Sequence, residues 1–134
     1  MAESEASIRG RVMRDMIAHV TQDHLIGKKI KNGALRKKIG TVEAPWKCPP
    51  CFELKTIPLE HMTMELLSLK ENPDTDKIIL QLHGGGYVGA MRNSYRMFAG
   101  LYNEVSHGMS VLTPDYRVAP EDPYPAALED AFAA

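Results

Sequence analysis

The chain has 134 residues, of which 44% are hydrophobic and 25% charged, and its formal net charge is −1. This is the composition of one modest globular domain, which excludes a disordered chain and gives no case for a nucleic-acid partner. No stretch approaches the roughly 18 consecutive apolar residues of a membrane span.

The first 45 residues are expected to form a helical segment outside the central sheet. The start, MAESEAS, has no apolar core of a secretory signal, which predicts a cytoplasmic protein. Ile8, Val12 and Val20 recur at helical spacing within residues 5–25. The basic run GKKIKNGALRKK has no interleaved aromatic residues, so we interpret it as a solvated face rather than a binding surface.

Cys48 and Cys51 form a C-x-x-C pair in the proline-rich linker GTVEAPWKCPP. Such a pair can be redox-active or can supply half of a zinc site. The chain has no second cysteine pair to complete a zinc site, and a strand pattern follows where the redox motif requires a helix. We therefore interpret the pair as part of a loop and predict no metal.

From Phe52 onward the pattern predicts a sheet. FELKTI and HMTMELLSL indicate two strands that form a hairpin across Pro58 and Leu59. KIILQLH, at residues 77–83, is short, continuous and β-branched, which is typical of a buried strand.

The remaining elements alternate between helix and strand. One apolar helix face consists of Tyr95, Phe98, Leu101, Tyr102 and Val105, and the helix is expected to end at His107-Gly108. MSVLTPD indicates a further strand, and another helix begins near Pro125. Strand, glycine turn, helix, strand and helix together predict an α/β fold.

The glycine cluster HGGGYVG at residues 83–89 leaves two interpretations open. Gly84, Gly86 and Gly89 fit the G-x-G-x-x-G spacing of a nicotinamide or flavin dinucleotide site, with Asp115 ending the next strand. The alternative is an oxyanion hole, because consecutive backbone N–H groups beside small residues can stabilise the anionic oxygen formed when a nucleophile attacks an ester. His-Gly-Gly-Gly between a strand and its helix is the arrangement of lipases and esterases.

A second stretch separates these alternatives. Together, LHGGGYVG and DYRVAPEDPYPAALEDA (residues 115–131) resemble the hormone-sensitive-lipase-like branch of the α/β-hydrolases. The resemblance is specific from about residue 78 to residue 131. It implies an α/β-hydrolase fold, truncated, with a cap-like segment at 1–45 and the N-terminal half of the core at 46–134. It also implies a carboxylic-ester hydrolase with a Ser-His-Asp mechanism and no cofactor.

The resemblance also implies roles for individual residues. Gly85 and Gly86 would donate N–H groups to the oxyanion, while Gly84 shapes the turn and His83 supports the loop by hydrogen bonding. Tyr87 would line the acyl pocket. The residues expected to structure the following loop are Asp115, Tyr116, Arg117 and Glu121. Asp122 departs from the histidine that the family often has there.

The nucleophile of such an enzyme is absent from the sequence. In this fold the nucleophilic serine is the central residue of a G-x-S-x-G motif. Of the serines in this sequence, only Ser110 has a glycine two residues earlier, and Leu112 stands where the second glycine is required. The catalytic serine, acid and histidine are therefore expected after Ala134, so this chain is predicted to be an inactive N-terminal part. Once completed, it would take a small-molecule ester. Alone, its apolar strand 78–82 would be an unpaired edge that self-associates. A non-catalytic remnant that binds a partner is the remaining alternative.

Overall fold

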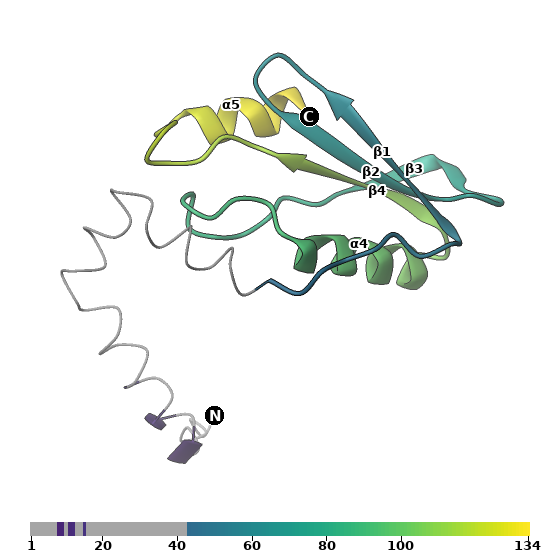
Figure 1. The fold of residues 1–134 in the computed structure, drawn as a ribbon, viewed down its shortest axis with the longest axis horizontal. Helices are drawn as coiled ribbons and strands as arrows, with labels where there is room; N and C mark the ends of the chain where they lie inside the picture. Colours follow the sequence, from purple (N-terminus) through teal and green to yellow (C-terminus); the bar gives the residue numbers. More distant parts are fainter. Residues whose placement is uncertain (1–7, 10, 13–14, 16–42) are drawn as a thin grey trace, which may run out of the picture.

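A computed structural model describes residues 8–9, 11–12, 15 and 43–134 (Figure 1). The five described residues before position 43 are helical, and among them Ile8 and Val12 are exposed. Most of the predicted helix at 5–25 and the whole basic run lie outside the described residues, so the cap-like role of segment 1–45 stays a prediction.

The predicted hairpin is present. β1 (Phe52–Pro58) pairs antiparallel with β2 (Thr63–Leu69), with Phe52 opposite Leu69 and Pro58 opposite Thr63. The second strand begins two residues later than its pattern suggested, because residues 59–62 form the turn. The Leu59 N–H donates to the Met62 carbonyl at 2.8 Å and closes this turn.

The other two strands are parallel and joined by a helix. β3 (Asp74–Leu80) runs beside β4 (Met109–Asp115), and α4 (Asn93–Val105) connects them. The sheet order is β1-β2-β4-β3, so β4 is an inner strand and β3 an edge. β3 begins and ends three residues before the predicted range 77–83. The last helix is α5 (Ala126–Ala133), as its proline-marked start predicted.

Side chains alternate across β4 into two apolar clusters, one on each face of the sheet. Val111 packs with Leu67 and with Ala99 of α4. Leu112 packs with Met64 and Tyr116 on the opposite face, where Ala127 of α5 lies against the cluster. The two helices therefore cover opposite faces (Figure 1), as expected for a three-layer α/β fold.

The apolar face predicted for α4 does not form the core. In the structure the helix turns Ala99 and Asn103 inward, whereas Phe98, Leu101, Tyr102 and Val105 are exposed. The small Ala99 packs against Leu67 of β2 and Val111 of β4 and allows α4 to lie close over these strands. The sequence pattern identified the helix correctly, but its apolar face is not the face that packs on the sheet.

β3 presents an apolar edge, as its sequence predicted. Its only sheet partner among the described strands is β4. Ile78 and Leu80 of β3, and Leu82 two residues beyond it, are 55%, 47% and 52% exposed. Ile79, which lies within the same predicted apolar edge, instead packs against the cluster of Leu67 and Val111. Within the part of the chain that the structure describes, no helix is long and apolar enough to cross a membrane.

Candidate active site

The glycine loop, residues 83–89, folds around the carbonyl of Gly85. That oxygen accepts the N–H groups of Val88 at 3.2 Å and Gly89 at 3.0 Å. Gly85 has φ +133°, and a Cβ placed there would lie 2.9 Å from the Gly89 Cα. Gly86 also has a positive φ, +62°, but a Cβ there would meet no atom within 4 Å. The backbone therefore requires glycine at 85 on steric grounds, whereas at 86 the restriction is conformational alone.

The N–H groups of the loop have different environments. The Gly84 N–H donates to the Tyr95 hydroxyl at 2.9 Å. The N–H groups of Gly85 and Gly86 have no acceptor among the described residues, and both glycines are exposed. Two adjacent unpaired backbone donors are suited to bind an oxygen that carries negative charge.

His83 is enclosed beneath the loop and is only 2% exposed. Its ring stacks on Tyr116 with centroids 3.9 Å apart, and its Nδ1 donates to the Gly84 carbonyl at 3.1 Å. The Nε2 atom has no hydrogen-bond partner among the described residues and lies 4.0 Å from Asp115 Oδ1. The buried ring is therefore shielded from solvent and contacts Tyr116 and the first glycine of the loop.

Tyr116 connects the end of β4 to the glycine loop. Its hydroxyl donates to the His83 carbonyl. Burial raises the pKa of Tyr116 above its ordinary value, and the nearby Tyr87 and Tyr95 act in the same direction. The phenol therefore keeps its proton and remains a hydrogen-bond donor across the neutral range.

The loop after β4 forms hydrogen bonds with both the glycine-loop region and α5. The Ala119 N–H donates to the Tyr87 carbonyl at 2.8 Å, and the Met91 N–H donates to Asp115 Oδ1 at 3.2 Å. Arg117 donates from Nη2 to Asp130 Oδ1 at 2.8 Å and from Nε to both carboxylate oxygens of Asp130. Glu121 is exposed on the same loop.

These loops enclose a cavity of about 880 Å³. Its wall contains the three glycines, His83 and Tyr87, and α5 closes the other side with Ala127, Leu128 and Ala131. One cavity therefore brings together His83, the three glycines, Tyr87 and Tyr116, with Asp122 also in its wall. The predicted loop residues Asp115, Arg117 and Glu121 are not among the residues that line it. The volume is that of a small-molecule site.

Two supporting residues were not predicted from the sequence. Tyr95 lies eleven residues after Gly84, and Asp130 lies thirteen after Arg117. Asp130 stands inside the quoted motif, so its acidic character was visible, but its pairing with Arg117 depends on how α5 folds back. The tyrosine on α4 gave no local signal for a contact with the loop.

Arg117 makes the stability of this region dependent on pH. Its hydrogen bonds lower the pKa of Asp130 below its ordinary value, against the opposing effect of burial. The folded state therefore binds fewer protons than the unfolded state in acid. The stabilisation is fully present above pH of about 4 and is lost as the pH falls through the lowered pKa.

Asp130→Asn is therefore expected to lower the unfolding temperature at pH 7 and to reduce its further decline below pH of about 4. Thermal unfolding at pH 7, 4 and 3 measures both effects. Asp76→Asn is the matched control, because Asp76 is exposed and makes no ion pair among the described residues. Parallel acid losses in the wild type and Asp130→Asn would contradict this assignment.

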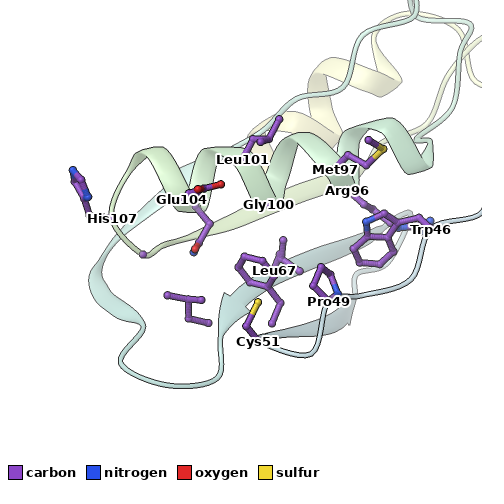
Figure 2. A pocket seen from close by; sticks show the side chains of 14 residues that line it. Trp46, Pro49, Cys51, Leu67, Arg96, Met97, Gly100, Leu101, Glu104 and His107 are labelled. Carbon is purple, nitrogen blue, oxygen red and sulfur yellow. The ribbon is translucent and has the colours of Figure 1, made fainter.

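A second cavity of about 630 Å³ lies between α4 and the hairpin. Figure 2 shows Trp46, Pro49 and Cys51 on one side of it and Met97, Gly100 and Leu101 of α4 on the other. Cys48 and Cys51 are both free thiols, and the Cys48 Sγ lies 3.6 Å from the Phe52 carbonyl. The pair lies in a loop and turn before β1, as predicted, and neither cysteine lines the cavity of the glycine loop.

The dinucleotide interpretation gains no support from the geometry. α4 begins at Asn93, four residues after Gly89, so no helix opens inside the glycine sequence. A pyrophosphate site requires helix N-terminal N–H groups directly beside these glycines.

Comparisons with known proteins agree with the hydrolase interpretation. The sequence profile of a family with the α/β-hydrolase fold matches residues 79–134. The chain is 42% identical over 59 residues to Esterase LipI of Mycobacterium tuberculosis, covering 42% of this chain and 18% of that protein. It is 32% identical over 63 residues to hormone-sensitive lipase of Bos taurus, covering 47% of this chain and 8% of the lipase.

Solved structures extend the likeness to the fold. A crystal structure of EstE5, soaked with p-nitrophenyl butyrate, has a TM-score of 0.63 and 33% sequence identity. The match covers 76% of this chain and 33% of the EstE5 chain. The chain thus spans about a third of this solved esterase and less than a fifth of the LipI sequence.

Proposed function

Because this chain carries a segment of a hormone-sensitive-lipase-like α/β hydrolase, we propose that it supplies the oxyanion hole for carboxylic-ester hydrolysis. The observation that carries the proposal is the pair of unpaired N–H groups at Gly85 and Gly86, two residues that line the same cavity as Tyr87. The ester would enter this cavity with its acyl group beside Tyr87. The carbonyl oxygen would lie against the two N–H groups.

In the proposed reaction, a serine hydroxyl adds to the ester carbonyl while a histidine takes its proton. The carbonyl π electrons move onto oxygen, which becomes the anion that Gly85 and Gly86 bind. Collapse of this intermediate expels the alcohol, which takes the proton back from the histidine, and leaves an acyl-serine. Water then releases the acid by the same two steps. Gly85 and Gly86 therefore stabilise both transition states.

The serine itself would come from outside the sequence described here. Ser110 is the nearest match to the nucleophile motif, but its Oγ lies 2.9 Å from Ser68 Oγ. It is the second residue of β4, whereas the glycine loop lies beyond the carboxyl ends of the parallel strands. Ser110 is thus at the wrong end of the sheet to attack a bound ester.

The 134-residue chain alone is therefore expected not to hydrolyse p-nitrophenyl butyrate above a protein-free control. Release of p-nitrophenolate, followed by absorbance across successive purification fractions, tests this. Saturable turnover that follows the protein and disappears in Cys51→Ala or Ser110→Ala would reveal a nucleophile within the chain. That result would contradict the assignment of this segment to the oxyanion hole alone.

A further inference from the structure

Tyr95 lies in the first turn of α4, and its side chain reaches back to the glycine loop. Its hydroxyl accepts the Gly84 N–H at 2.9 Å. Its ring also contacts His83, with centroids 5.6 Å apart. One side chain of the helix therefore touches both residues that open the loop.

The backbone of Tyr95 is held in turn by the sheet. The Gln81 side-chain Nε2 donates to the Tyr95 carbonyl at 3.0 Å and to Thr113 Oγ1 at 3.0 Å. Gln81 and Thr113 are buried, and Thr113 belongs to the inner strand β4. Buried hydrogen bonds of this kind are costly to leave unpaired, so they fix the position of the helix start relative to the sheet.

The contact with Tyr95 determines which of the three glycine N–H groups lack a hydrogen-bond acceptor. Gly84, Gly85 and Gly86 are consecutive and exposed, and their side chains alone give no physical reason for Gly84 to differ from the other two as a donor. In the structure only the Gly84 N–H has an acceptor among the described residues, and that acceptor is Tyr95. The hydroxyl therefore separates one donor from the other two.

We propose that Tyr95 is a positioning residue that selects the oxyanion donors. By accepting the Gly84 N–H, it removes that donor from the cavity and holds the loop with Gly85 and Gly86 open to an anionic oxygen. This inference rests on the proposed function and deepens it, because it names the side chain that keeps the Gly84 N–H apart from the two oxyanion donors.

Hydrogen exchange followed by mass spectrometry tests the proposal in the 134-residue chain. In Tyr95→Phe, a peptide spanning residues 82–92 is expected to exchange about two- to tenfold faster, the effect of losing one net hydrogen bond. A peptide spanning β4 is expected to keep its wild-type rate. Tyr102→Phe is the matched control, because it removes a hydroxyl from the same helix on its exposed face.

An unchanged rate for residues 82–92 in Tyr95→Phe would overturn the proposal. Faster exchange of β4 together with the loop would also overturn it, because Tyr95 would then hold the whole fold rather than the loop. Neither measurement requires ester hydrolysis, so failure of this inference is distinguishable from failure of the proposed function.

Gly84→Ala provides a second, independent test. A Cβ at Gly84 would lie 3.2 Å from the Tyr95 hydroxyl oxygen, so the new methyl group must displace that oxygen. The displacement disappears when the hydroxyl is absent. Gly84→Ala is therefore expected to accelerate loop exchange in the wild type but by less than half that factor in Tyr95→Phe. Independent, multiplicative effects of the two substitutions would contradict the proposed contact.

Discussion

Gly85→Ala is expected to lower kcat by roughly 10²–10³-fold in an active protein that carries this chain, the loss seen when an oxyanion donor is removed. The new Cβ would lie 2.9 Å from the Gly89 Cα, which is backbone and cannot rotate aside. The loop would have to open, and the Gly85 carbonyl would lose the Val88 and Gly89 N–H groups that shape the turn.

Gly86→Ala is the matched control for this prediction. Its Cβ would enter open space, so only the positive φ opposes the substitution, at about 1–2 kcal/mol. We expect its kcat to fall less than about tenfold. Steady-state kinetics of both variants with one short-chain ester gives the comparison. An equal fall in kcat for the two variants would show that the steric clash at Gly85 is unimportant. An unchanged kcat for both would show that these glycines do not take part in the reaction.

The second large effect concerns the edge strand β3. We propose that the isolated 134-residue chain self-associates through this edge, because Ile78, Leu80 and Leu82 are half-exposed and the strand has one partner in the described sheet. Unpaired, apolar edges promote pairing with other chains. The charged residues of β3, Asp74, Asp76 and Lys77, all precede Ile78, so no charge lies among its exposed apolar residues.

Leu80→Lys is expected to convert this associating chain to a monomer, since a charge on an edge strand disfavours pairing. Phe132→Lys is the control, because Phe132 is exposed on α5 rather than on β3 and the substitution adds the same charge. Sedimentation velocity over a concentration series distinguishes the species. A wild-type chain that stays monomeric throughout, or equal effects of both lysines, would refute association through β3.

The elements with strong local patterns were predictable from the sequence. Each of these elements has a local signal, either periodic apolar residues or turn residues close together in the sequence. They are the hairpin, the parallel strands, α4, α5 and the glycine loop. The α/β-hydrolase fold followed from two quoted motifs, which the comparisons support over residues 79–134.

The features that depend on tertiary contacts could not be predicted from the sequence. Periodicity identified an apolar stripe on α4 but could not show that Ala99, rather than Phe98 or Leu101, faces the sheet. Helices pack closest where side chains are small, and that depends on the neighbouring strands. Likewise, the Gly84–Tyr95 and Arg117–Asp130 contacts join residues that only the folded chain brings together.

Transplantation tests the central claim most directly. Residues 43–134 would replace the equivalent segment of EstE5, with which the chain shares 33% identity and a TM-score of 0.63. The account predicts that the chimera hydrolyses p-nitrophenyl butyrate and that Gly85→Ala in the same chimera abolishes most of this turnover while leaving it folded by circular dichroism. A folded chimera without turnover, or one whose turnover is unaffected by Gly85→Ala, would contradict the assignment of these residues to an oxyanion hole.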